Sequence, residues 1–377
     1  MSRPRSPGLS TAALAVVFGL AACKQTEPNR GAPADAAAAA DGADDASPDG
    51  VTDAPDADAR AAPPCRVGGT RADVPTTIGC PSSVPGRLVV AGDFVYWTVQ
   101  GPGAIVVRAP LVGGAGEELV RDDAGAFGLA VDGQFVYYGQ PGAARIMRIP
   151  LSGGLPVTLA GHAGDPLFLV KDGASLYWTD AGVDGKVVKL DLVDGAQPVT
   201  LIDGQSRPRA LAVRDGFVYW TDVIDGTLLR TPDHLTGPPD AAVRTASRLA
   251  SGLGVTIGGS PSGPTDLLLV GDYAYVPDGH GFIRRVPLAG GDLEPVADAQ
   301  GTPYGIATDG VSIYWSTLGI GGGIFKAPLE QATPDGGGAP FTLVYGDQPD
   351  PHFVAVTADN VYWTVWGARP AVARIAK

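Results

Sequence analysis

A pair of large side chains, most often Tyr-Trp, ends an apolar run seven times along this chain. Successive tyrosines are 41, 40, 42, 56, 39 and 48 residues apart. A period near 40 residues, in a chain with 54 Gly and 34 Pro, predicts a repeated unit of short strands joined by tight turns. The anchors are Tyr96, Tyr137, Tyr177, Tyr219, Tyr275, Tyr314 and Tyr362.

Other features keep phase with these anchors. An apolar run and an Asp-Gly dipeptide precede several pairs, as at Asp172-Gly173, and Asp-Gly is a strong hairpin signal because the turn needs positive φ. Pro-Leu follows later in four repeats, and Pro marks the end of a strand because it cannot donate to the ladder. A basic residue also recurs once per repeat, which indicates a structural role, at Arg108, Arg148, Lys189, Arg230, Arg285, Lys326 and Arg374.

Each unit therefore reads as four antiparallel strands. Seven such units arranged radially predict an all-β fold, a seven-bladed β-propeller, which is one solution to the problem of unpaired sheet edges. Two segments lengthen the period, residues 231–264 and 331–340. They are interpreted either as tolerated surface loops or as loops specific for a partner.

The last repeat stops at Lys377, just after its third strand. A blade that is one strand short would expose an edge, so we expect the propeller domain to span residues 65–377, with residues 65–85 supplying the missing strand. Cys65 and Cys80 lie in this segment. A disulfide between them would stabilise the fold by about 3 kcal/mol and is allowed in an oxidising compartment.

The N-terminus has the organisation of an export signal. Residues 1–22 carry two arginines, a short apolar stretch and small residues before Cys23, which predicts a signal peptide too short to span a bilayer. Leu20-Ala21-Ala22-Cys23 resembles the lipobox of bacterial lipoproteins. The resemblance implies cleavage before Cys23, lipidation of its thiol and, with Lys24 next, an outer-membrane anchor facing the periplasm or the cell surface. An ordinary secretory signal is the alternative.

Residues 23–64 have the composition of a tether. Ala, Asp, Pro and Gly dominate, with no aromatic residue, so the segment cannot bury enough apolar surface to offset its ordering entropy. We expect it to be disordered. The whole chain carries a net charge of −13 and has no basic cluster. We therefore do not expect it to bind nucleic acid, because such binding depends on basic residues that contact the phosphates.

Tyr177-Trp-Thr-Asp180 and Tyr219-Trp-Thr-Asp222 resemble the YWTD repeat of low-density-lipoprotein-receptor-type propellers, over roughly residues 86–377. The resemblance implies that these residues pack and bond neighbouring blades and that the domain binds partners. Two departures limit it. Only two of the seven repeats keep all four letters, and that family has six blades.

No catalytic or metal-binding signature stands out. The four histidines lie in separate repeats, and no Gly-x-Ser-x-Gly elbow, phosphate loop or zinc motif is present. A calcium loop is one interpretation of Asp180–Asp184 or Asp222–Asp225, although neither segment has the spacing of an EF-hand. No cofactor is otherwise expected. Solvated turns explain these aspartates more simply.

Propellers usually bind ligands across the face formed by the loops that enter the first strand and link the second and third strands. We therefore expect a protein- or glycan-binding or scaffolding module of the envelope, attached to the membrane through Cys23. The alternative is an envelope hydrolase or lyase acting at the central channel. The loops of this face carry Phe127, Asp165, Arg207, Tyr304, His352, Asp184, Asp225, Asp278, His280 and Trp366.

Overall fold

The computed structural model describes residues 75–377 except 183, 235–244, 255, 258–259, 262, 299–300, 320–321, 330–340, 347 and 349. The predicted signal peptide, Cys23, the tether, Cys65 and the segment 331–340 therefore lie outside the described residues. Within those that are described, no helix has the length and apolarity needed to span a membrane.

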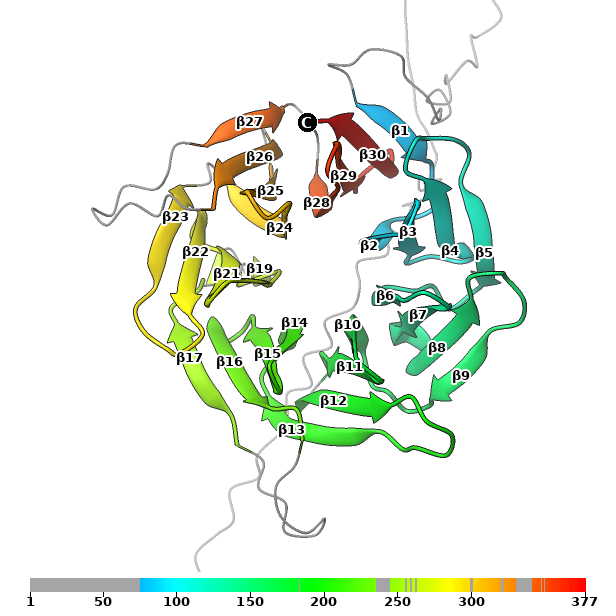
Figure 1. Cartoon of the computed structure of the whole chain (residues 1–377), viewed down its shortest axis with the longest axis horizontal. Helices are drawn as coiled ribbons and strands as arrows, with labels where there is room; N and C mark the ends of the chain where they lie inside the picture. Colours follow the sequence, from blue (N-terminus) through cyan, green and yellow to red (C-terminus); the bar gives the residue numbers. More distant parts are fainter. Residues whose placement is uncertain are drawn as a thin grey trace, which may run out of the picture. The chain divides into compact units, whose positions relative to one another are not determined.

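Seven four-stranded antiparallel sheets surround a common axis, which confirms the predicted seven-bladed propeller (Figure 1). Within each blade the strands follow one another from the axis outward. Blades 1 to 3 are β2 (Pro85–Ala91), β3 (Phe94–Val99), β4 (Gly103–Pro110) and β5 (Glu117–Asp122); β6 (Leu129–Val131), β7 (Phe135–Gln140), β8 (Arg145–Pro150) and β9 (Val157–Ala160); and β10 (Pro166–Asp172), β11 (Ser175–Asp180), β12 (Gly185–Asp191) and β13 (Val199–Gln205).

Blades 4 and 5 are separated by a short hairpin of β18 (Thr256–Ile257) and β19 (Ser260–Pro261). A single 3-10 turn, Pro141–Ala143, links β7 to β8. Blades 4 to 6 are β14 (Pro208–Arg214), β15 (Phe217–Asp222), β16 (Thr227–Pro232) and β17 (Ser247–Ser251); β20 (Leu268–Val270), β21 (Tyr273–Asp278), β22 (Phe282–Pro287) and β23 (Glu294–Asp298); and β24 (Thr302–Thr308), β25 (Ser312–Leu318), β26 (Gly323–Pro328) and β27 (Thr342–Tyr345).

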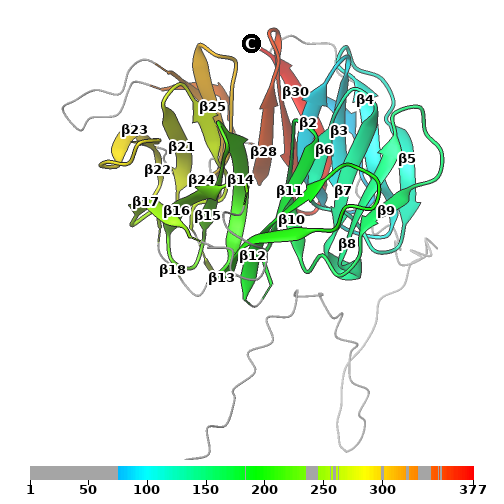
Figure 2. The same ribbon diagram turned by 60° about the horizontal axis from the view of Figure 1, so that its bottom comes forward.

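Blade 7 joins the two ends of the described chain. Its strands are β28 (Pro351–Val356), β29 (Asn360–Val365), β30 (Ala371–Ala376) and, as the outer strand, β1 (Thr76–Gly79). β1 pairs with β30 in the register Thr76 to Arg374 and Thr77 to Ala373, and the two lie side by side in Figure 1. Seen obliquely, β28 and β30 stand beside β2 and β3, where the ring closes (Figure 2).

The predicted Asp-Gly turns differ in how they close, and the Asp carboxylate forms the turn at both Asp132 and Asp309. Asp215 and Gly216 both have positive φ, 50° and 76°, as a two-residue hairpin requires. Gly133 does not have positive φ. There, the Asp132 carboxylate instead accepts the backbone N–H groups of Gln134 and Phe135, both at 2.8 Å, so the side chain forms the turn.

In every blade, the anchor tyrosine of the second strand pairs across the sheet with the basic residue of the third strand. Arg108, for example, lies directly opposite Tyr96 and Arg374 opposite Tyr362. Arg108 Nη1 then donates to the Leu151 carbonyl of the next blade at 2.8 Å. Arg230 does the same with the Leu288 carbonyl at 2.6 Å. Arg374 likewise bonds the Leu111 and Val112 carbonyls of blade 1, so these three members of the series tie neighbouring blades, and the structural role that the periodicity indicated is confirmed for them.

Tryptophans and hydroxyls complete the seams between blades. Trp97, Trp178, Trp220, Trp315 and Trp363 are all at most 1% exposed. Two residues along the chain from Tyr177, the Thr179 hydroxyl donates to the Arg209 carbonyl of the next blade at 2.7 Å. The hydroxyls of Thr98, Thr221 and Ser316 make the equivalent bonds. These side chains bond one blade to the next, which is what the YWTD resemblance implies.

Candidate functional site

The axis of the ring is filled at one end by seven side chains, one from each blade. All come from the start of an inner strand or from the one or two residues before it. Three are cationic or acidic and four are aromatic, and we call them the axial set. Its members are Arg87, Phe127, Phe168, Arg209, Asp266, Tyr304 and Phe353.

The inner strands pair irregularly at the positions from which the axial side chains project. Pro begins β2, β10, β14 and β28, a position where the missing N–H is tolerated. A register shift follows in each, for example between Pro85 and Leu88 and between Pro351 and Val354. Such bulges bend a strand and redirect a side chain. The same signature, Pro followed closely by Arg, Phe or Tyr, recurs in five inner strands.

Aromatic rings make the apolar part of the axial set. The Phe127 and Phe353 ring centroids are 5.7 Å apart in an edge arrangement, and Phe168 lies 6.3 Å and 6.2 Å from them. Tyr304 adds a further edge contact with Phe353 at 5.4 Å. Edge-to-face pairs at these distances are favourable beyond the area they bury. The rings therefore pack as a small core on the axis.

An ion pair crosses this core from blade 1 to blade 5. Arg87 Nη1 lies 3.1 Å from Asp266 Oδ1, and their side chains are 22% and 7% exposed. The guanidinium carbon of Arg87 also lies over the Phe168 and Phe353 rings, 4.4 Å and 4.6 Å from their centroids. Asp266 accepts two backbone N–H groups as well, from Leu267 and Ile306. Both carboxylate oxygens of Asp266 therefore face donors.

A second cluster lies beside the axial set. The His352 and Trp366 rings are stacked, with centroids 3.7 Å apart and 13° between their planes. Tyr304 contacts both, at 4.4 Å and 6.2 Å, and its hydroxyl accepts a hydrogen bond from Arg209 Nη2. We call Arg209, Tyr304, His352 and Trp366 the rim cluster.

The environment of His352 keeps its imidazole neutral. Burial lowers its pKa to about 4, and the nearby charge of Arg209 acts in the same direction, against the bond to the Asp350 carbonyl. His352 Nδ1 lies 2.9 Å from that carbonyl. Because a carbonyl oxygen only accepts, Nδ1 carries the proton, which leaves Nε2 as an acceptor.

The remaining predicted face residues lie outside this cluster. Asp165 is half-buried, and burial together with the Asp180 charge raises its pKa. Arg207, Asp184 and Asp225 are exposed. Asp278 is fully buried and bonds Arg284 and His280 within blade 5. Of the ten predicted residues, the structure brings four into the axial set or the rim cluster: Phe127, Tyr304, His352 and Trp366.

Five members of the axial set and rim cluster were not predicted from the sequence: Arg87, Phe168, Arg209, Asp266 and Phe353. An offset of ten residues before the anchor tyrosine selects His352 in blade 7, where the structure instead puts Phe353, nine residues before Tyr362, on the axis. The signal that would have found them is the Pro that precedes a large or charged side chain at the start of the inner strand.

The loops considered for calcium serve as turns. Asp180 Oδ1 accepts the backbone N–H groups of Asp165 and Gly182, and Asp222 accepts those of Arg207 and Ile224. In the described part of the chain, no group of three or more His, Cys, Asp or Glu side chains is arranged to hold a metal ion.

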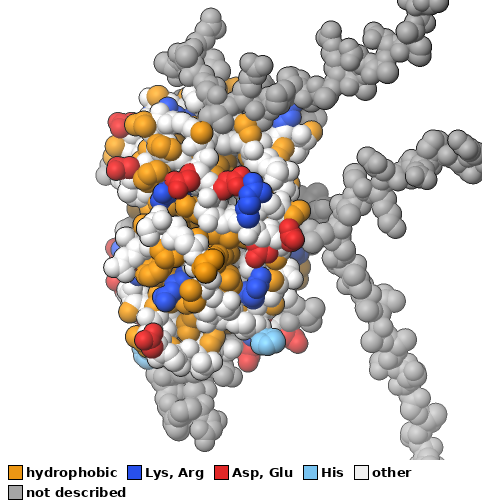
Figure 3. Space-filling view, turned by 90° about the vertical axis from the view of Figure 1, so that its right-hand side faces the viewer, with side chains coloured by type: hydrophobic (Ala, Val, Ile, Leu, Met, Phe, Trp, Pro, Cys, Tyr) orange, Lys and Arg blue, Asp and Glu red, His pale blue; other side chains and the backbone are white. Residues whose placement is uncertain are grey.

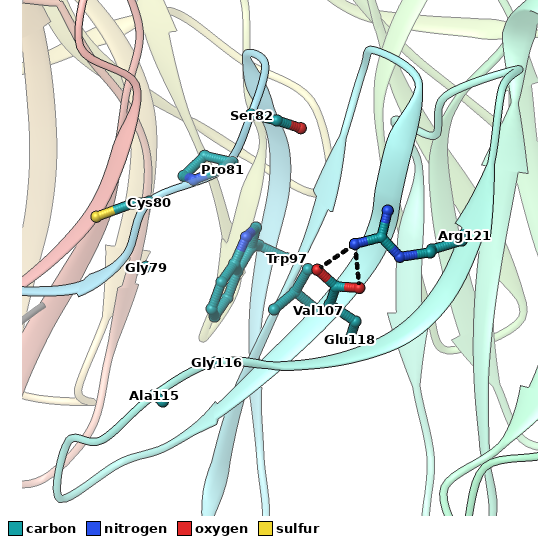
Figure 4. Close-up of a pocket in the computed structure, with 10 residues that line it drawn as sticks. All are labelled: Gly79, Cys80, Pro81, Ser82, Trp97, Val107, Ala115, Gly116, Glu118 and Arg121. Carbon is teal, nitrogen blue, oxygen red and sulfur yellow. Dashed lines mark hydrogen bonds and ion pairs between the residues drawn. The ribbon is translucent and has the colours of Figure 1, made fainter. Parts of the chain in front are cut away.

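Two cavities lie away from the axial set, where blade 7 meets blade 1. One of about 340 Å³ is lined by Cys80, Trp97 and the Glu118–Arg121 ion pair (Figure 4). The other, of about 770 Å³, lies among Phe94, Val112 and residues 357–360. The outer surface seen in Figure 3 interleaves hydrophobic with charged side chains.

We expect acid to destabilise the protein through His352. Its folded pKa, about 4, lies below the ordinary 6.5, so the unfolded chain binds the proton first. Stability is therefore lost as the pH falls from 6.5 towards 4, by about 2 kcal/mol between pH 7 and pH 5. Chemical denaturation at the two pH values measures this loss. His352→Gln should flatten the dependence, and an unchanged slope would contradict the assignment.

Comparison with known proteins identifies the fold. No family model matches the sequence, and no curated protein matches it. Among solved structures, the chain is similar to a streptogramin B lyase, with a TM-score of 0.61 and 15% identity over 82% of this chain and 100% of that one. It is also similar to the WD40 β-propeller domain of Doa1, with a TM-score of 0.60 and 12% identity over 80% and 95%.

A computationally designed protein, Ika8, is also similar, with a TM-score of 0.53 and 15% identity over 78% of this chain and 98% of that one. At such identities the similarity concerns the fold. The protein is a seven-bladed β-propeller.

Proposed function

We propose that this protein is a lipid-anchored binding module of the cell envelope, and that it binds a protein or glycan ligand at the end of the ring that carries the axial set. Three features of the chain support the proposal: the signal-like segment that ends at Cys23, the acidic tether of residues 23–64, and the propeller that follows it. Lys24 after the lipidated cysteine favours the outer membrane. A disulfide between Cys65 and Cys80 belongs to the same proposal.

The filled axis is the observation that carries the binding role. The packed side chains close the axis at this end, so a ligand would meet a rigid surface and not an open channel. A preorganised surface loses little conformational entropy on binding. The axial set and the rim cluster together gather Arg, Tyr and Trp at this end, and these are the side chains that most often dominate binding energy at interfaces. The one acid of the axial set, Asp266, is already bonded to Arg87.

Fractionation tests the anchor. We expect the full chain to sediment with membranes and the Cys23→Ala variant to be released into the soluble fraction, because the variant lacks the thiol that would carry the lipid. A Cys80→Ser variant serves as the control and should remain with the membranes. Full membrane retention of Cys23→Ala would contradict the proposed anchor.

A further inference from the structure

The two arginines on the axis differ in their charge balance. Arg87 is paired with Asp266, whereas no described acid lies within ion-pair distance of Arg209. The Arg209 guanidinium carbon lies 5.2 Å from the Tyr304 ring centroid, and its Nε is buried without an acceptor. A half-buried cation without an anion is costly unless a ligand completes it.

A second unpartnered donor lies beside it. Trp366 Nε1 is buried and bonds no acceptor in the described part of the protein, although the large majority of buried polar side-chain atoms in native structures find a partner. Unpartnered indole nitrogens also occur between the blades, at Trp97 and Trp363 for example. Trp366 differs from those because it stands outside the repeat, in the loop between β29 and β30, and contacts Tyr304 and His352.

The rim cluster also supplies one acceptor. His352 Nδ1 is committed to the Asp350 carbonyl at 2.9 Å, so its Nε2 is left to receive a proton donor from a ligand. Around the Tyr304 ring, the cluster therefore combines three groups. They are the Arg209 guanidinium without an anion, the Trp366 indole N–H without an acceptor, and His352 Nε2, which can accept a hydrogen bond. A ligand that satisfies all of them needs a carboxylate and a hydroxyl close together.

We infer that the rim cluster is a binding site for the carboxylate end of an acidic sugar. A hexuronic acid carries its carboxylate and a hydroxyl on adjacent ring carbons, which matches the donors of Arg209 and Trp366 and the acceptor of His352. Arginine suits a carboxylate because its planar fork donates in parallel. This inference rests on the proposed binding function and names the ligand class for that face.

Binding involves a shift of Trp366, because both unpartnered nitrogens lie below the surface of the free protein. The loop that follows Trp366 is exposed from Gly367 to Arg369, so a movement there disturbs little packing. Because the chain has six tryptophans, a fluorescence change that Trp366→Phe abolishes reports occupancy of the site.

Titration of the full chain with glucuronate, followed by calorimetry and tryptophan fluorescence, tests the inference. We expect glucuronate to bind and neutral glucose not to bind. Arg209→Gln should weaken glucuronate binding at least tenfold, and Trp366→Phe, which keeps the ring and removes the N–H, several-fold. Arg214→Gln is the matched control, because Arg214 ends the same strand at its opposite end and bonds the Gly271 carbonyl; its affinity should equal that of the wild type.

Three results would overturn the inference: no glucuronate binding by the wild type, equal binding by Arg209→Gln, or N-acetylglycine binding as tightly as glucuronate. Melting curves exclude misfolding as the cause of a loss, because removal of an unpaired cation should leave the melting temperature unchanged or raise it. If a ligand is found at this end of the ring and glucuronate does not bind, the inference fails and the proposed binding function stands.

Discussion

Arg87→Met should lower the free energy of unfolding by about 3 to 5 kcal/mol, the usual effect of removing one partner of a buried ion pair. The reason is that Asp266, with a side chain only 7% exposed, loses the cation that compensates its carboxylate. The contacts of the guanidinium with the Phe168 and Phe353 rings are lost at the same time. Denaturation in guanidinium chloride at pH 7 measures the change.

The double variant Arg87→Met/Asp266→Asn is the informative control. Asparagine carries no charge, yet its side-chain oxygen can still accept the N–H groups of Leu267 and Ile306. The double variant should therefore recover a large part of the stability that the single variant loses. A loss below about 1 kcal/mol for Arg87→Met, with no recovery in the double variant, would show that the ion pair does not hold the axis together.

Removal of the chain up to Ser83 should destabilise the propeller more than any other truncation outside the repeats. It deletes β1, exposes the edge of β30 and removes Ile78, which is fully buried. Burial of one such side chain is worth about 2 to 3 kcal/mol, and each ladder hydrogen bond adds about 1 kcal/mol. We expect a lower melting temperature and concentration-dependent aggregation through the open edge.

A chain that begins at Ala61 is the matched control, since it lacks the tether and keeps β1. It should melt like the wild type. Ile78→Ala should fall between the two, with a loss of about 2 to 5 kcal/mol. If the chain that begins after Ser83 melts with the control, β1 is dispensable and the ring closes by contacts within the repeats alone.

The repeat made the architecture predictable from sequence. The phase of the Tyr-Trp pairs gave the blade number, including the blade of Tyr275, where the second aromatic is replaced by Val276. The incomplete last repeat pointed to a strand before Pro85, and β1 occupies that place. These features are local or periodic, so a single sequence contains them.

The candidate site was only partly predictable, for a physical reason. Arg87 and Asp266 are 179 residues apart, and nothing local in either segment signals the other. The axial side chain stands nine residues before the anchor tyrosine in blades 1 and 7 and ten residues before it in blade 6. The inner strands of these blades share the same register and the same bulge, so a fixed offset of ten finds Tyr304 and misses Phe353. Asp278 illustrates the opposite error. Its place in a loop suggested exposure, yet Arg284 and His280 bury it in a bonded network.

Site-specific photo-crosslinking in the native envelope tests the binding role most directly. A photoreactive residue at Asp225, exposed at the end of the ring that carries the axial set, is compared with one at Asp215, exposed in the turn at the opposite end of the same blade. We expect a discrete crosslinked species from position 225 that Arg209→Gln weakens, and none from position 215. Crosslinks from position 215 alone, or equally from both positions, would contradict binding at the axial end.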